Sequence, residues 1–279
     1  MSKHLAPVLG HIHVPKCAGT SVRKVLDETL GSGHLALYFG NCTTFIYEDA
    51  QLADFVRPET VKAFSSHFVR RFPPELGNRR IHYVTFLREP VQQFISYITF
   101  TKKNYAVLNE PVLISHLPPE MPNLSVRECA RWILNGDRRV FRNFHENYTP
   151  NFFARYPVLH SRGFTYSDER YQRIRLRAAK AELDKFLFVG ISEQMDKSWQ
   201  LLRSRADAIG ITLPDMHIPQ ENPSSELRDD LSWINPNDEV GRKVLDSIAE
   251  DRKLYRWALD RFESQSKHRR KLFYFWKTR

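Results

Sequence analysis

The chain has 279 residues, a formal net charge of +10, and 42% hydrophobic and 13% aromatic residues. This length and composition predict a globular protein with a large core, and we expect a single domain over residues 1–279. No apolar run reaches the ~18 residues of a transmembrane helix, and 3 widely spaced cysteines argue against a disulfide framework or a zinc site. The positive charge favours anionic partners without naming one.

The first 30 residues predict a strand, a tight loop and a helix. Residues 8–14 are an apolar run typical of a strand, and residues 21–30 carry apolar side chains at helical spacing. The loop between them contains Lys16, Gly19, Thr20 and Ser21. Backbone N–H groups at a helix start, together with a lysine, can bind a phosphate-like anion. The alternative is an ordinary strand–loop–helix turn with a surface lysine.

The middle of the chain continues the alternation of strands and helices. Further strands are expected at residues 36–39, 61–68, 81–88 and 186–192. Helices are expected at residues 47–56, after Pro90, and at residues 125–134, 140–148, 168–184, 193–209 and 236–262. Residues 73–78 are expected to form a loop.

Several residues mark where the later helices begin and end. Tyr171, Ile174, Ala178 and Ala181 predict the apolar side of the helix over residues 168–184. We expect Ser192 to cap the helix that follows it and Gly210 to close that helix. For the last helix, Asn235 is the expected cap and Pro236 the first residue.

The order of these elements predicts the fold class. Strands alternating with helices indicate an α/β, P-loop-like three-layer sandwich around a mainly parallel sheet. Residues 104–166 lack strand patterns and are interpreted as a variable helical insertion. Ligands of such sheets bind beyond the carboxyl ends of the strands. The loops after Val14, His67 and Arg88 are therefore expected to lie at one edge of the sheet.

A second polar pair follows the strand over residues 81–88. Arg88 ends the strand, and Ser96 lies eight residues later on the next helix, a little over two turns away. The arginine fork and the serine hydroxyl are suited to one anionic group. An ion pair between Arg88 and Glu89 is the structural alternative.

The loop is not a Walker A motif, because that pattern places its lysine after the last glycine, whereas Lys16 precedes Gly19. The segment HVPKCAGTS at residues 13–21 instead resembles the phosphosulfate-binding loop of sulfotransferases that use 3′-phosphoadenosine-5′-phosphosulfate (PAPS). The segment FLREPVQQFISY at residues 86–97 resembles the 3′-phosphate-binding motif of the same family. Within the family, the chain looks most like the carbohydrate sulfotransferase branch that contains heparan sulfate 2-O-sulfotransferase. Residues 188–202 and 251–262 are also similar, but residues 104–182 match weakly.

This resemblance implies a PAPS-dependent O-sulfotransferase that releases 3′,5′-ADP (PAP) and needs no metal. Lys16 would act at the sulfuryl group, and Arg88 and Ser96 would bind the 3′-phosphate. The 5′-phosphate would be held by the rest of the loop, which comprises Cys17, Ala18, Gly19, Thr20 and Ser21. A later loop would cover the nucleotide, with Asn222, Ser224 and Arg228 as candidate contacts.

The acceptor is expected to be a hydroxyl of a carbohydrate, glycolipid or other metabolite. Relatives place a catalytic histidine after the strand that corresponds to residues 61–68, which makes His67 the candidate base; a structural histidine is the alternative. An imidazole is suited to this task, because its ordinary pKa is near ~6.5. Glu48 and Asp49 are the fallback bases, whereas His13 is expected to point into the packing.

The acceptor pocket is expected to be shaped by aromatic and arginine side chains of the insertion, although core packing is the alternative for any one of them. They are Trp132, Phe141, Tyr148, Phe153, Tyr156, Arg131, Arg138, Arg139 and Arg142.

The C-terminal residues 263–279 form a basic tail with interleaved aromatic residues. Docking of these aromatic side chains on the domain is the expected arrangement, and peripheral contact with an anionic membrane is the alternative. With no signal peptide in the first residues, we expect a cytoplasmic protein, and we expect no nucleic acid partner. A P-loop-type kinase and a catalytically silent anion- or glycan-binding relative are the competing functions.

Overall fold

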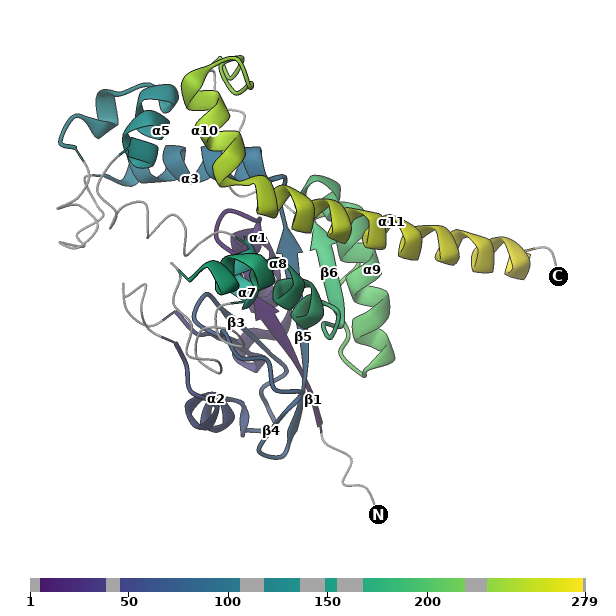
Figure 1. Ribbon diagram of the computed structural model, residues 1–279. Helices are drawn as coiled ribbons and strands as arrows, with labels where there is room; N and C mark the ends of the chain where they lie inside the picture. The colour runs from purple at the N-terminus through teal and green to yellow at the C-terminus, as the bar shows by residue number, and fades with distance from the viewer. Residues whose placement is uncertain are drawn as a thin grey trace.

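The computed structural model describes residues 6–38, 46–105, 118–135, 149–154, 168–218 and 230–277, with side chains as far as residue 265. These residues form a six-stranded, mainly parallel sheet with helices against both faces (Figure 1). The predicted α/β three-layer class is therefore confirmed. The strands are β1 (Ala6–Ile12), β2 (His34–Ala36), β3 (Ala63–Ser66), β4 (Glu75–Leu76), β5 (Arg79–Leu87) and β6 (Phe188–Ile191).

The strand order is β2-β3-β1-β5, and both β4 and β6 pair with β5. All pairs are parallel except the short β4–β5 hairpin. Ile12 of β1 is in register with Ser66 of β3 and with Thr85 of β5, so the three strands end at the same edge. The chain leaves β1 toward β2 and leaves β5 toward β6, in opposite directions along the sheet. The carboxyl ends of β1 and β5 therefore form the topological switch point where α/β sheets bind ligands.

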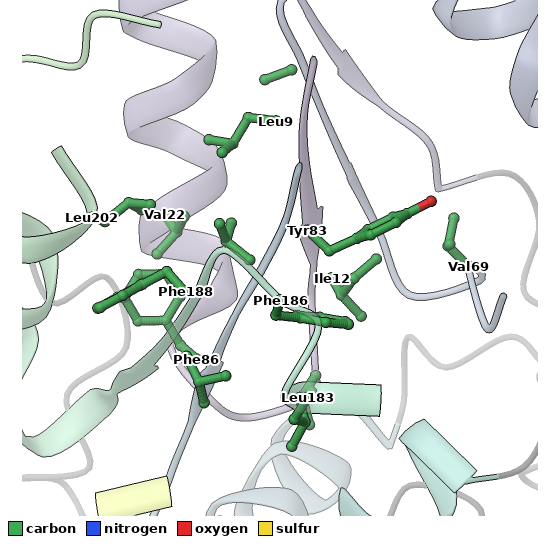
Figure 2. Packing of buried hydrophobic residues seen from close by; sticks show 14 of the residues in the cluster. Leu9, Ile12, Val22, Val69, Tyr83, Phe86, Leu183, Phe186, Phe188 and Leu202 are labelled. Carbon is green, nitrogen blue, oxygen red and sulfur yellow. The ribbon is translucent and has the colours of Figure 1, made fainter. Parts of the chain in front are cut away.

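Helices cover the two faces of the sheet. They are α1 (Gly19–Leu30), α2 (Asp49–Val56), α3 (Pro90–Asn104), α5 (Val126–Asn135), α7 (Thr149–Ala154), α8 (Glu169–Leu183), α9 (Met195–Ala208), α10 (Glu239–Ser247) and α11 (Ala249–Lys277), with short 3₁₀ turns η1 (Gly31–Gly33), η2 (Met121–Asn123) and η4 (Ser192–Gln194). Figure 2 shows Val22 of α1 and Leu202 of α9 on one side of the strands, and Leu183 of α8 on the other side with Tyr83 and Phe186. The main core thus fills both interfaces between helices and sheet.

A second apolar cluster lies beyond the carboxyl ends of the strands, where α3, α5 and α10 gather (Figure 1). Its buried residues include Ile98 of α3, Ile133 of α5 and Val244 of α10. The expected helical insertion is therefore divided between two cores: α5 packs in this cluster, whereas α7 places Phe152 and Phe153 in the main core. Because Phe153 is completely buried, it packs in the core and does not line an open acceptor pocket.

Most of the predicted elements are present with small shifts of their ends, but five details were wrong. The second strand was expected at residues 36–39, but it covers His34–Ala36. It pairs with β3 in a register that places His34 opposite Ala63. The expected loop at residues 73–78 contains β4, which turns back onto β5 at Gly77 with φ of 60°. In α8 the buried positions are Tyr171, Ala179 and Leu183, whereas Ala181 is exposed.

The fourth detail concerns the helix caps. Ser192 does not cap α9; its hydroxyl donates to the carbonyl of Leu87, 2.9 Å away, and α9 begins three residues later. Gly210 follows α9 with φ of 81°, as expected of a residue that closes a helix. The carboxamide oxygen of Asn235 accepts from the N–H groups of residues 237 and 238 in a turn, and the cap of α10 is Asp238, which accepts from Val240 and Gly241.

The single helix expected over residues 236–262 is in fact two helices, α10 and α11. The helical conformation is interrupted at Ile248 between them. In Figure 1, α11 runs past β6 and α9 and continues beyond them toward the C-terminus. The predicted helix over residues 140–148 lies outside the described residues. Within the described ranges, none of the helices combines the length and the apolar composition that a membrane crossing requires.

Candidate functional site

The loop of residues 13–21, called the anion loop below, connects β1 to α1 in an unusual backbone conformation. Lys16 and Ala18 have φ values of 63° and 61°, in the left-handed region that side chains other than glycine rarely adopt. Each such residue costs roughly 1–2 kcal/mol. Strain of this kind concentrates at binding and catalytic sites, because the surrounding structure must hold it in place.

The turn leaves a row of backbone donors at the start of α1. Ala18 precedes the helix and has no side chain that could cap it. The N–H groups of Ala18, Gly19 and Thr20 donate to no other described residue, whereas the N–H of Cys17 is used by the carbonyl of Val14, 3.3 Å away. Ser21 is buried, and Thr20 is exposed at the helix end. Successive unused N–H groups at the positive end of a helix dipole bind anions.

Lys16 lies beside these donors, and its environment is unfavourable for a positive charge. Partial burial and, secondly, the guanidinium of Arg88 lower the pKa of Lys16 from 10.5 to about 8. Its Nζ rests 4.2 Å from the ring centroid of Phe100, a side chain that is 44% exposed. No carboxylate of the described residues forms an ion pair with Lys16. An anion bound at the loop would relieve this repulsion.

Arg88 and α3 attach to the same loop. The guanidinium of Arg88 donates to the carbonyl of Lys16 at 3.3 Å, and the Gln93 amide donates to the carbonyl of Pro15 at 2.9 Å. Ser96 is half-buried about one helical turn before Phe100 on the same side of α3, since the two are four residues apart. The structure thus brings Arg88 against the anion loop beside Lys16, and Ser96 lies on the side of α3 that carries Phe100, the ring that Lys16 contacts.

The packing of His13 requires a glycine at position 19. A Cβ atom at this position would lie 1.8 Å from Cδ2 of His13, so glycine is needed because the imidazole packs against the backbone. His13 is buried, and its Nδ1 is 2.7 Å from the hydroxyl of Tyr38. The expectation that His13 points into the packing is therefore correct.

His67 follows β3 and stacks on His13, with ring centroids 4.0 Å apart. Its Nδ1 is 2.5 Å from the carbonyl oxygen of His13. Because a carbonyl only accepts, Nδ1 carries the proton and Nε2 keeps its lone pair. Burial, and then the charges of Arg70 and Arg23, lower the pKa of His67 to about 4, although the hydrogen bond to the carbonyl of His13 acts in the opposite direction.

The remaining candidates have structural roles or lie outside the described residues. Glu48 caps α2 in a reciprocal pair with Gln51, and Asp49 forms an ion pair with Arg71 at 2.9 Å, so both fallback bases are engaged. Burial raises the pKa of the Cys17 thiol above its ordinary range, which keeps it protonated. Three predicted nucleotide contacts lie outside the described residues: Asn222, Ser224 and Arg228.

Sequence reasoning missed two residues that support the loop. Gln93 bridges it to α7, because its Oε1 accepts from the hydroxyl of Thr149 at 3.3 Å. Asp251 of α11, which is buried, accepts from the N–H of Thr149 at 2.8 Å. Gln93 lies within the segment that resembles the 3′-phosphate motif, so its position was visible, but nothing in the sequence connects residues 93, 149 and 251.

Comparison of the chain with known protein families finds no matching family, and comparison with curated proteins finds no similar sequence. In the described residues, no three histidine, cysteine, aspartate or glutamate side chains are arranged to hold a metal ion. The anion loop is therefore the feature of the described residues that points to a function.

Proposed function

We propose that the protein is a PAPS-dependent O-sulfotransferase that acts on a hydroxyl of a carbohydrate, glycolipid or other small metabolite. The observation that carries this proposal is the arrangement of the anion loop. Unused N–H groups of residues 18–20 lie beside the ammonium of Lys16 and the guanidinium of Arg88, at the switch point of the sheet. This is a site for a ligand with more than one anionic group, and PAPS is such a ligand.

Each part of the site has a role in this reaction. PAPS supplies the sulfuryl group, and the backbone N–H groups of Ala18, Gly19 and Thr20 would bind its 5′-phosphate. Arg88 and Ser96 would bind the 3′-phosphate, which distinguishes PAPS from adenosine nucleotides that lack this group. Lys16 would stabilise the negative charge that develops on the leaving phosphate oxygen.

The acceptor hydroxyl must lose its proton to a base. His67 has the required tautomer, because its Nδ1–H is fixed by the carbonyl of His13 and its Nε2 can accept. The low pKa of His67 makes it a weak base in the free protein, and a bound polyanion would raise that pKa. The carbohydrate or lipid nature of the acceptor remains an expectation from the family resemblance.

Calorimetry tests the nucleotide site. We expect 3′,5′-ADP to bind the full chain at least about tenfold more tightly than 5′-AMP, because only the former engages Arg88 and Ser96. Arg88→Ala should remove this preference, and Lys16→Ala should weaken 3′,5′-ADP binding. Lys62→Ala, at an exposed lysine before β3, is the matched control for the loss of one positive charge. A preference for ATP with Mg²⁺ would overturn the proposal in favour of a kinase.

Transfer of labelled sulfate from PAPS to a metabolite extract, with mass spectrometry of the products, tests the activity and identifies the acceptor. Lys16→Ala should abolish labelling, because the charge on the leaving oxygen is then unopposed. If 3′,5′-ADP binds but no extract is labelled and PAPS is never consumed, the chain is a catalytically silent anion-binding protein.

A further inference from the structure

The backbone of the anion loop is held in its strained conformation by groups from other elements. The φ and ψ angles of Lys16 are set by the two peptide planes that flank its Cα atom, one shared with Pro15 and the other with Cys17. The φ of Lys16 is 63°, in the left-handed region that disfavours a residue with a side chain. The hydrogen bonds to these two planes therefore decide whether the loop keeps its shape.

The peptide plane between Lys16 and Cys17 is held on both sides. Its carbonyl accepts from the guanidinium of Arg88 at 3.3 Å, and its N–H donates to the carbonyl of Val14, also at 3.3 Å. Arg88 is charged, so a bound anion attracts the same guanidinium. The hydrogen bond within the loop, from Cys17 to Val14, does not depend on the ligand.

The peptide plane between Pro15 and Lys16 depends on helix α3. Its carbonyl accepts from Nε2 of Gln93 at 2.9 Å, and within the described ranges this is the one hydrogen bond that the plane receives. Gln93 is buried and neutral, so a bound anion does not draw it away from the loop. It can hold the plane in the same place in the free and in the occupied site.

Gln93 is itself fixed in one orientation. Because a carbonyl only accepts, the amide nitrogen faces Pro15, and the amide oxygen accepts from the hydroxyl of Thr149 at 3.3 Å. The N–H of Thr149 donates to the carboxyl of Asp251 at 2.8 Å, and both residues are buried. This series of hydrogen bonds from Asp251 to Pro15, called the loop support below, joins α11, α7 and α3 to the anion loop. Helix α11 also packs against α3 and α7.

We propose that Gln93 is a positioning residue that keeps Lys16 in its left-handed conformation, and that the loop support is part of the anion site. This inference rests on the proposed function only for the identity of the ligand. The N–H groups of residues 18–20 follow directly after Lys16, so their direction depends on its φ and ψ. Loss of Gln93 should therefore weaken anion binding although the change removes no charge and none of these N–H donors.

NMR of the full, isotope-labelled chain tests the restraint without a ligand. A strong intraresidue NOE between the amide proton and Hα marks a positive φ, and we expect it at Lys16 and Ala18 in the unaltered protein. Gln93→Leu should weaken this NOE at Lys16, because the freed peptide plane relaxes toward a negative φ. Gln92→Leu, one position earlier, is the matched control, since the half-buried side chain of Gln92 forms no hydrogen bond to another described residue. An unchanged NOE at Lys16 in Gln93→Leu would overturn the inference.

Titration with inorganic sulfate, followed at the amide signals of residues 18–20, tests the consequence for binding. We expect the sulfate affinity of Gln93→Leu to fall roughly tenfold and that of Gln92→Leu to stay unchanged, because in the former binding must restore a disfavoured conformation. Adding Ala18→Gly to Gln93→Leu should recover part of the loss, since glycine adopts the φ of 61° at this position without a steric penalty. A purely structural role of Gln93 would give no such recovery. Full affinity in Gln93→Leu, or no recovery in the double variant, would contradict the positioning role.

Thr149→Val is a milder test that applies even if Gln93→Leu does not fold. Valine has nearly the shape of threonine and keeps the N–H that binds Asp251, so only the hydroxyl that orients the Gln93 amide is lost. We expect smaller losses of the NOE and of sulfate affinity, in the same direction as for Gln93→Leu. Thr99→Val removes a hydroxyl that donates to the carbonyl of Ile95 at 3.0 Å within α3 and is the control. Equal values for the two valine variants would refute the loop support.

Sulfate and nucleotide binding separate the two proposals. If sulfate responds as expected but the unaltered protein binds 3′,5′-ADP no better than 5′-AMP, the proposed function fails and the role of Gln93 stands. If the unaltered protein prefers 3′,5′-ADP and Gln93→Leu binds both probes as tightly, the function stands and this inference fails. Amide signals of residues 18–20 that do not move with sulfate in the unaltered protein would refute the anion loop and both proposals.

Discussion

Replacing Lys16 by methionine should make the protein more stable while it loses anion binding. The charged lysine is disfavoured in the folded protein, as the fall of its pKa from 10.5 to about 8 shows. In full, this difference corresponds to about 3 kcal/mol, at ~1.36 kcal/mol for each pKa unit. Because the side chain is partly exposed, solvent screening reduces the cost to about 1–2 kcal/mol.

Methionine keeps most of the aliphatic contact with Phe100 but loses the cation–π interaction, which is worth about 0.5–1 kcal/mol. We therefore expect Lys16→Met to raise the free energy of unfolding by about 1 kcal/mol at pH 7. The sign follows from the lowered pKa: the lysine penalty is complete below the folded pKa of about 8 and disappears as pH rises toward 10.5, where the lysine also becomes neutral in the unfolded chain.

Urea denaturation at several pH values between 7 and 10.5 measures this difference, with the exposed Lys62→Met as the control. The advantage of Lys16→Met should be largest at pH 7 and should shrink through the upper part of this range. A variant that is less stable than the unaltered protein at pH 7, or an advantage independent of pH, would refute the reasoning. The same variant should also bind 3′,5′-ADP more weakly.

Three further substitutions have defined outcomes. Gly19→Ala should lower the free energy of unfolding by about 1–3 kcal/mol in urea denaturation, because its Cβ would collide with the ring of His13; an unchanged midpoint would mean that the ring moves freely. Arg79→Met should cost about 3 kcal/mol or more by the same measurement, since three backbone carbonyls (residues 6, 58 and 61) lose their common donor, and a cost below about 1 kcal/mol would contradict this role. Burial raises the pKa of Asp251 to about 7, so the unaltered protein should lose stability as pH rises from about 4 to above 7. Asp251→Asn keeps an acceptor for Thr149 and should raise the thermal midpoint at pH 8 more than at pH 5; an equal effect at both would show that the carboxyl does not titrate in this range.

Local signals in the sequence were sufficient for the elements that position the site. The buried strand before Arg88 and the helix that starts at Pro90 follow from β-branched residues and from a proline that fits a first helical turn. The strand–loop–helix order around Lys16 followed in the same way from an apolar run and a helical period. These features depend on interactions between residues a few positions apart, and the sequence shows such residues directly.

The sequence could not show which of two neighbouring N-cap candidates caps a helix. Asn235 and Asp238 are both good N-cap residues, and only the packing of the helix in the cluster of α3, α5 and α10 selects Asp238. Ser192 was expected to cap a helix, but its hydroxyl donates to the carbonyl of Leu87 in the adjacent strand β5. The two residues are 105 positions apart in the sequence.

What the sequence by itself determined is thus the set of strands and helices, their α/β class, and a strand–loop–helix turn with Lys16 in its loop. Only the tertiary structure decided that Arg88 reaches the carbonyl of Lys16 and that His13 and His67 stack beside the loop. The physical reason is that sheet order and register bring together residues more than 50 positions apart, and the hydrogen bonds of these side chains depend on which donors and acceptors then meet.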